Sequence, residues 1–343
     1  MTMTDAMAAP EGANLKDRKT GLVVFGILGI IAGAFCVLLA GFMLIGMAAS
    51  QVAAQTPASS MPTATPKFLM PMALLYLLPA AWFIWMGIGS IKARRWARAL
   101  ILVSSWLWLV SGVVSVVSIV VLRPNFYTQM AQKDQIPAAV AMVMSIVMLV
   151  FMVVLYVVVP GMLVLFYGSR HVKATCERLD PQVRWTDKCP LPVLAVSFMF
   201  AVWFCCLPLT GFAFYAWLST SVSAIVAGVL CVIGALVLMA MYGYVAWGTY
   251  RLRIAAWWAA VAVFILWAVL AGIMFSRMSL MDFYAKAGFT PQQLDTIRSS
   301  IPSQSSMLVF SSLWLIAVLG YLVYTRRFFT QGNAAQPGPA QQV

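Results

Sequence analysis

The sequence predicts an all-α integral membrane protein with about eight transmembrane helices. The first observation behind this prediction is composition: 63% of the 343 residues are hydrophobic and only 9% are charged, whereas soluble domains carry roughly 25% charged residues. The second is that the apolar residues lie in long uninterrupted runs and not at the spacing of a surface helix. So few charges do not cover a soluble protein of this length, and we therefore expect the runs to lie in a bilayer.

Each transmembrane helix requires about 20 apolar residues to cross about 30 Å of hydrocarbon. Eight runs are long enough, at 21–48, 68–91, 99–121, 138–167, 191–217, 222–247, 254–275 and 306–325. The first run exceeds the roughly 7–15 apolar residues of a secretory signal, so we expect an uncleaved span. Only the short polar stretch Ser219–Ser223 separates the fifth run from the sixth.

The runs divide the chain into two membrane halves, residues 21–167 with spans 1–4 and residues 191–329 with spans 5–8. Residues 168–190 form the loop between them. The ends, 1–20 and 330–343, are polar and without periodicity, which predicts disordered tails. Between the seventh and eighth spans, a capping pattern at Ser279 and Thr290-Pro291 favour two short helices.

Lys and Arg are distributed unevenly between the two sides of the predicted membrane. Sixteen of the 22 flank one side, and such an excess marks the cytoplasmic face. This places both termini and the loop 168–190 in the cytoplasm, and we expect the membrane to be a bacterial inner membrane. The formal net charge of +13 is thus a topology signal, and no loop is long enough to form a basic domain that binds nucleic acid.

A weak internal repeat relates the first four predicted spans to the last four. The run GMLV at Gly161 matches GYLV at Gly320, and Trp96 matches Trp257. Because four spans is an even number, the sequence predicts two tandem four-helix repeats in parallel orientation. The alternative is chance matching in a biased composition.

The chain carries no strong catalytic, metal or cofactor motif. All nine acidic residues lie in tails or loops, and His171 is the single histidine. Intramembrane ionisable groups mark proton relays and ion sites, so their absence from the runs argues against a pump. The sequence lacks span histidines for haem and the HExxH motif of zinc proteases. We therefore predict no cofactor and no enzymatic activity.

The loop 168–190 is the densest polar region. Its histidine and two cysteines are of metal-ligand type, but their spacing matches no compact zinc motif, so we predict no metal site. Val172, Cys176 and Leu179 fit the apolar stripe of a helical continuation of the fourth span, and Trp185 suits a membrane interface. We interpret the loop as a docking surface with four candidate residues: His171, Cys176, Trp185 and Cys189.

The third predicted span carries a stripe of serines within about 60° of one another at 100° per residue: Ser104, Ser111, Ser115 and Ser118. Small hydroxyls can hydrogen-bond to their own helix, which favours a packing stripe. The alternative is a polar track for a neutral solute, because hydroxyls bind solute without carrying charge. We expect packing, with no cavity on this face.

Small residues recur at close spacing in several spans, as at Gly26, Gly29 and Gly33. Such faces let helices approach closely, within one bundle or between subunits. Proline inside a span frees a backbone carbonyl and kinks the helix, and three spans contain one: Pro79, Pro160 and Pro208.

These features favour a non-catalytic membrane scaffold or complex subunit that packs against a membrane-protein partner or a second copy of itself. The alternative function is a facilitative transporter or channel for a neutral or amphipathic solute, with its path between the two halves. A lipid-modifying membrane enzyme is the second alternative. Membrane lipids are expected partners in every case.

Overall fold

The computed structural model describes residues 16–54, 66–122, 137–218, 223–277 and 304–334, together with Met281, Ala285, Leu294 and Asp295. The elements in these ranges are helical. They are α1 (Lys19–Ala54), α2 (Pro66–Ile91), α3 (Arg95–Leu122), α5 (Ala138–Val153), a π-helical turn (Val154–Val158), α6 (Val159–Gly168), α7 (Arg170–Leu179), a 3-10 turn (Trp185–Lys188), α8 (Leu191–Leu218), α9 (Ala224–Tyr250), α10 (Ile254–Arg277) and α13 (Gln304–Ala334).

Six described helices are long and apolar enough to cross a membrane, which makes this a helical membrane protein. They cover Lys19–Gly46, Arg95–Val120, Met142–Gly168, Leu191–Pro208, Ile225–Tyr250 and Ile254–Ile273. Each coincides with one of the predicted runs. The other two predicted runs, 68–91 and 306–325, lie within α2 and α13, and α2 has a shorter apolar stretch at Leu75–Ile91.

The outer surface of the helices is apolar, as expected for a protein that faces lipid. Leu165 on α6 is 78% exposed and Ile225 on α9 is 81% exposed. Soluble proteins rarely expose large contiguous apolar patches. In hydrocarbon the exposure of such apolar side chains carries no free-energy cost.

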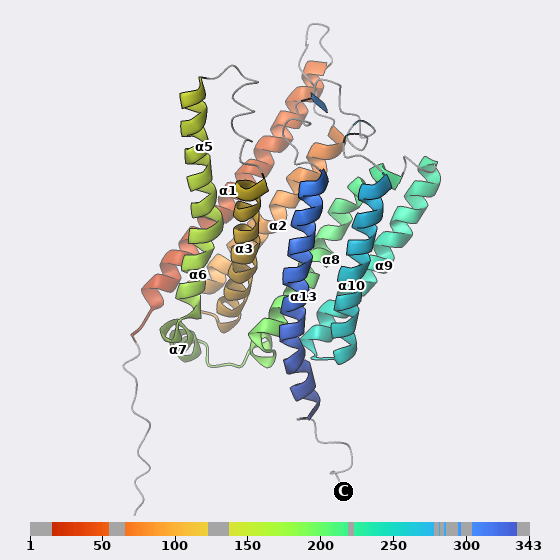
Figure 1. Ribbon diagram of the computed structural model, residues 1–343. Helices are drawn as coiled ribbons and strands as arrows, with labels where there is room; N and C mark the ends of the chain where they lie inside the picture. The colour runs from red at the N-terminus through yellow and green to blue at the C-terminus, as the bar shows by residue number, and fades with distance from the viewer. Residues whose placement is uncertain are drawn as a thin grey trace, which may run out of the picture.

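Figure 1 shows the helices as one bundle, with α3, α8 and α13 in the middle. On one side α1 packs along α2, and α5 and α6 pack on α3; on the other side α8 packs on α9, and α10 contacts both α9 and α13. The amphipathic α7 lies across the lower end of the bundle, near the first turns of α1 and α3. The two halves of the chain meet where α2 and α3 contact α8 and where α3 contacts α13.

The small residues of the first predicted span pack against another helix of the same chain. A Cβ added at Gly26 would lie 2.7 Å from the Gly87 carbonyl oxygen of α2, and one added at Gly33 would lie 2.9 Å from the Ala80 carbonyl oxygen. Only glycine allows backbones to approach this closely. The glycine face of α1 is thus a contact with α2.

Pro160 explains the change of helix type between α5 and α6. Proline lacks an N–H and so leaves the carbonyl four residues earlier, that of Tyr156, without its helical donor. The Val159 amide bonds to the carbonyl of Val154, the five-residue spacing of a π-turn. The Tyr156 carbonyl oxygen lies against Gly112 of α3, where an added Cβ would overlap it. Gly112 therefore allows α3 to approach this kink.

A tight turn connects α2 to α3. The amides of Ala93 and Arg94 donate to the carbonyls of Ser90 and Gly89, at 2.8 and 3.0 Å. This pair of bonds is the Schellman motif, in which one residue takes the left-handed conformation, and Ala93 has φ 47°. A Cβ on Gly89 would lie 2.6 Å from the Ala97 Cβ, so glycine here allows α3 to fold back against α2.

A second turn, between α9 and α10, has the same construction. The amides of Leu252 and Arg253 donate to the carbonyls of Thr249 and Gly248, both at 2.9 Å. Leu252 has φ 56°, and a Cβ on Gly248 would lie 2.5 Å from the Ala256 Cβ. Each residue of this turn follows its counterpart in the first by 159 positions.

The offset between the two turns can be compared with the matches of the predicted repeat. In the register of the two turns, Trp96 is equivalent to Ala255 and Trp257 to Arg98, which differs by two positions from the sequence match of Trp96 with Trp257. The spacing of the turns is that of Gly161 and Gly320.

Two further predictions concern segments that flank the predicted spans. The helix α13 continues to Ala334, into the tail predicted to be disordered. The short helices expected around Ser279 and Thr290 lie largely outside the described residues.

Candidate functional site: a cavity between the two halves

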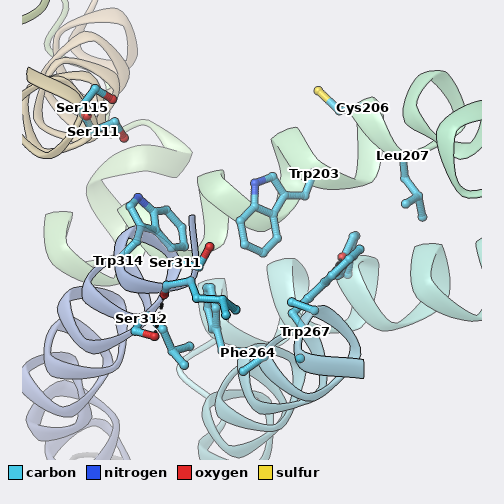
Figure 2. A pocket seen from close by; sticks show the side chains of 16 residues that line it. Ser111, Ser115, Trp203, Cys206, Leu207, Phe264, Trp267, Ser311, Ser312 and Trp314 are labelled. Carbon is cyan, nitrogen blue, oxygen red and sulfur yellow. Dashed lines mark hydrogen bonds between the residues drawn. The ribbon is translucent and has the colours of Figure 1, made fainter. Parts of the chain in front are cut away.

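A cavity of about 730 Å³ lies among α3, α8, α9, α10 and α13. Figure 2 shows the labelled side chains that line it, with serines from α3 and α13 and aromatic rings from α8, α10 and α13. Half 1 of the chain contributes Ser111 and Ser115, and half 2 contributes the rest of the lining. We call this space the hydroxyl cavity.

One wall of the hydroxyl cavity is a cluster of aromatic rings. The ring of Trp203 lies 5.4 Å from that of Phe264 and 6.5 Å from that of Trp314, to which it is stacked. The rings of Phe264 and Trp314 are 6.2 Å apart. Such spacings are favourable for aromatic pairs, so the wall is fixed by contacts among its own side chains.

The polar groups of the cavity are neutral. The Ser115 hydroxyl donates to the Ser111 carbonyl at 2.8 Å, and the Ser312 hydroxyl donates to the Leu308 carbonyl at 2.8 Å. A hydroxyl that donates within its own helix keeps oxygen lone pairs for another donor. The indole N–H of Trp267 donates to the Tyr242 hydroxyl at 2.6 Å, which leaves the Tyr242 O–H as a donor for a ligand.

No carboxylate, ammonium, guanidinium or imidazole lines this cavity among the described residues. An ion that entered would lose its hydration without a partner of opposite charge, which is costly. General acid–base chemistry also requires titratable groups in contact with substrate. The arrangement is suited to holding an uncharged molecule that has both hydroxyl or amide groups and an apolar surface.

The predicted serine stripe is divided by the structure. Ser111 and Ser115 line the hydroxyl cavity, so the expectation that no cavity opens on this face was wrong for these two. The lining does not include Ser104 and Ser118, whose hydroxyls donate to the carbonyls of Ile101 and Val114 at 3.1 and 2.7 Å. Helical periodicity identified the right face of α3, but the helices opposite it determine where the face is open.

The sequence interpretation did not include the cavity residues of half 2. Trp203, Phe264 and Trp314 were among many aromatic residues in apolar runs, with no local pattern to separate them. Ser311 and Ser312 are adjacent hydroxyls in the eighth predicted run. Such a pair in an apolar segment is a usable signal, because each buried hydroxyl requires a hydrogen-bond partner.

The loop 168–190 is docked on the chain itself. Ser169 has extended backbone (ψ 144°), and its side chain accepts the amide of Val172 at 3.3 Å. This cap starts α7 as a separate helix, so the expected continuation of the fourth span was wrong. Val172 and Cys176 are fully buried, as the predicted stripe required, whereas Leu179 is 42% exposed.

The buried carboxylate of Asp180, 2% exposed, fixes α7 to the turn between α2 and α3. It accepts two hydrogen bonds from the guanidinium of Arg184, at 2.7 and 3.1 Å, and one from the Arg95 amide at 3.3 Å. Arg94 lies 3.5 Å away as a further cation. The Arg184 hydrogen bonds lower the pKa of Asp180 below its usual value against the opposing effect of burial. The carboxylate is therefore ionised at neutral pH.

The four candidate docking residues do not form one surface. Cys176 and Cys189 are buried in two different apolar clusters, and burial raises the pKa of their thiols to about 11 and about 12. Trp185 is half-exposed, and its carbonyl accepts the Tyr250 hydroxyl at 3.0 Å. The Nδ1 atom of His171 is buried and has no hydrogen-bond partner. Among the residues described, no group of three His, Cys, Asp or Glu is placed to hold a metal ion.

Comparison with known proteins adds no relative. No protein-family model, no curated protein and no solved structure matches this chain.

Proposed function

We propose that the chain crosses a bacterial inner membrane eight times with both termini in the cytoplasm. The uneven distribution of Lys and Arg supports this orientation. In the structure α7, the start of α1 and the end of α13, which carry many of these Lys and Arg residues, lie at one end of the bundle (Figure 1). The first turn of α1 and the last turn of α13 lie on the same side of the bundle (Figure 1), as an even number of spans requires.

The two halves are proposed to be tandem repeats. The two Schellman turns have the same hydrogen bonds, the same left-handed position and the same close glycine–alanine contact. Their offset equals that of Gly161 and Gly320. Matched backbone geometry at the same offset supports duplication over chance matching in a biased composition.

The proposed activity is the binding and facilitated passage of an uncharged, amphipathic solute. The observation that carries it is the hydroxyl cavity, which lies between the halves and offers neutral hydrogen-bonding groups beside an aromatic wall. Ligand sites commonly combine such an apolar lining with a few polar groups that fix orientation. The charge-free lining described above favours binding and passage over catalysis.

The scaffold function becomes the second proposal. It rests on faces of small residues that another subunit would cover and on the loop 168–190 as a docking surface. The glycine face of α1 contacts α2, and Ala227, Ala256 and Ala260 are fully buried within the chain. These faces are used by the bundle itself, which weakens the case for a subunit interface there.

Passage through the hydroxyl cavity is tested in liposomes that contain the purified protein. The probe is an alkyl glucoside with a fluorophore at the end of its chain, and dithionite added outside bleaches only accessible probe. We expect the protein to expose the protected inner pool. An alkyl phosphate with the same fluorophore should stay protected, because no cation compensates for its charge in the cavity.

Variants on α3 separate the cavity from simple packing. Ser115→Leu should block passage of the glucoside and leave thermal stability unchanged, since the side chain enters open space. Ser115→Ala should slow passage by about 2- to 10-fold, the rate equivalent of one neutral hydrogen bond. Ser118→Leu, outside the cavity on the same stripe, is the matched control. Unchanged passage with a lowered unfolding temperature in Ser115→Leu would show a packing stripe and refute the proposal.

A further inference from the structure

A second hollow, of about 530 Å³, lies between α3, α8 and α13. Apart from Ser111 and the hydroxyls of two tyrosines, its lining is aliphatic or aromatic, with no charged side chain among the described residues. Ser111 and Trp314 line both this hollow and the hydroxyl cavity. The two spaces are therefore adjacent at these residues, and we call the second one the apolar groove.

The apolar groove has a buried floor and an open rim. Val196 of α8 and Leu322 of α13 form the floor and are 2% and 1% exposed. On the rim, Trp106 and Val110 of α3 are 50% and 48% exposed. The outer surface of α3 faces hydrocarbon in a membrane-spanning bundle, so the rim opens sideways to the bilayer rather than to water.

We propose that the solute is an uncharged amphiphile with a single alkyl chain. Its hydroxylated head lies in the hydroxyl cavity and its chain lies in the apolar groove, which it enters sideways from the bilayer. This inference rests on the proposed function and specifies its solute class. The observation that carries it is that the two spaces adjoin and share Ser111 and Trp314 in their linings.

The division of the two spaces matches the energetics of such a ligand. An alkyl chain that moves from lipid into an apolar groove gains little net free energy, because both environments are hydrocarbon. The chain does, however, provide van der Waals contacts to lining side chains that would otherwise face empty space. Recognition then depends on the head, which exchanges hydrogen bonds with the serine hydroxyls. A solute without a chain would leave the groove unused.

The orientation of the ligand follows from the helix register. From Leu102 to Ser111 the groove runs about 14 Å along α3, at 1.5 Å per residue. Its lower part includes Leu191 and Tyr324, at the end of the bundle assigned to the cytoplasm, and the hydroxyl cavity lies beyond Ser111. The head therefore lies near the middle of the predicted spans, and the chain extends from it toward the cytoplasmic end of the bundle.

Photo-crosslinking locates the chain. The protein in liposomes is irradiated with an alkyl glucoside that carries a diazirine at the end of its chain, and labelled peptides are identified by mass spectrometry. We expect labels on the segments of α3 and α13 that line the groove, competed by unlabelled alkyl glucoside. Labels spread evenly over the lipid-facing helices, or confined to the hydroxyl cavity, would overturn the inference.

A matched pair of substitutions on α13 tests the groove directly. Ala317→Trp fills it and should reduce the crosslinks about tenfold, because the chain would have to displace the ring, and a cost of about 1.4 kcal/mol is enough to produce that decrease. Ile316→Trp places the same ring on the adjacent position, 66% exposed and outside the groove, and should leave them unchanged. Val110→Trp blocks the groove from α3 and gives an independent variant if Ala317→Trp does not fold. Equal labelling in all variants would refute chain binding in the groove.

The two proposals fail in different ways. Passage that is sensitive to Ser115→Leu but accompanied by no crosslinks in the groove would retain the proposed function and reject the single-chain amphiphile. Absence of passage in the wild-type protein would reject the proposed function itself.

Discussion

Single residues hold α7 against the bundle, and Asp180 is the clearest case. Its carboxylate is buried and is surrounded by Arg184, Arg94 and the amide of Arg95. A buried charge is tolerated only when its partners satisfy it, and removal of one member leaves the others unpaired. The other acids on α7 and the following turn are more exposed, so their ion pairs contribute less.

Asp180→Asn is therefore expected to destabilise the protein by about 1.5–3 kcal/mol, the range for hydrogen bonds to charged groups. Because the folded state lowers the pKa of Asp180, its contribution is complete at neutral pH and is lost as the pH falls below about 4. Thermal unfolding at pH 7 and at low pH measures both effects. The acid-induced loss should be smaller in the Asn variant, and Glu177→Gln, with a side chain 41% exposed, is the control. Equal stability of wild type and Asp180→Asn at pH 7 would contradict this account.

The serine stripe shows what sequence can establish at the residue scale. The period of 3.6 residues per turn placed Ser111 and Ser115 on one face of α3. It did not show that they face open space, because that depends on Trp314 and Ser311, about 200 positions later in the chain. Residues brought together by distant segments have no local signal, so the part of the lining that half 2 contributes, which is most of it, remained outside sequence-based prediction.

At the scale of elements, the two Schellman turns fix how α3 and α10 start. Gly248→Ala is expected to lower the unfolding free energy by about 1–3 kcal/mol, since the added methyl would overlap the Ala256 Cβ. Ala256→Gly in the same chain should restore most of the loss by removing that contact. Gly234→Ala, on α9 with no atom within 4 Å of the added Cβ, is the control.

In the first half, Ala97→Gly should restore only part of the loss caused by Gly89→Ala, because the added Cβ would also lie 2.9 Å from the Trp96 ring. Thermal unfolding of the single and double variants measures this as two double-mutant cycles. If the second-site change rescues neither turn, close contact is not the reason for glycine at these positions.

Hydropathy predicted the helices better than the connections between them. The runs at 191–217 and 254–275 agree with α8 and α10 because burial of backbone polar groups in lipid forces apolar segments into helices. The start of α7 was missed because it depends on one side-chain cap, Ser169, which interrupts an otherwise helical stretch. A single capping residue determines such a helix boundary, and hydropathy averaged over a window of residues does not detect it.

On the scale of the whole molecule, the hydroxyl cavity follows from the way the two halves meet. Each half builds its own helix pairs, α1 with α2 and α8 with α9, through extensive contacts. The seam between halves, at α3, α8 and α13, is packed less continuously and contains both hollows. The class of architecture was predictable from composition, whereas the seam was not, since it depends on the relative position of two independently packed units.

The assignment of inner and outer sides depends on the predicted orientation of the chain in the membrane. The test uses a variant without the native cysteines, into which single cysteines are introduced. Ser59 and Thr296 report on the predicted outer side. Arg178, whose side chain is 62% exposed, reports on the cytoplasmic side. The excess of Lys and Arg predicts that a membrane-impermeant maleimide applied to intact cells labels the first two and not the third. Inverted membrane vesicles should give the opposite pattern, and full labelling after solubilisation confirms that each thiol is reactive. Labelling of Arg178→Cys together with Ser59→Cys from the outside would mean that the number of spans between them is even, and the eight-span topology would have to be abandoned.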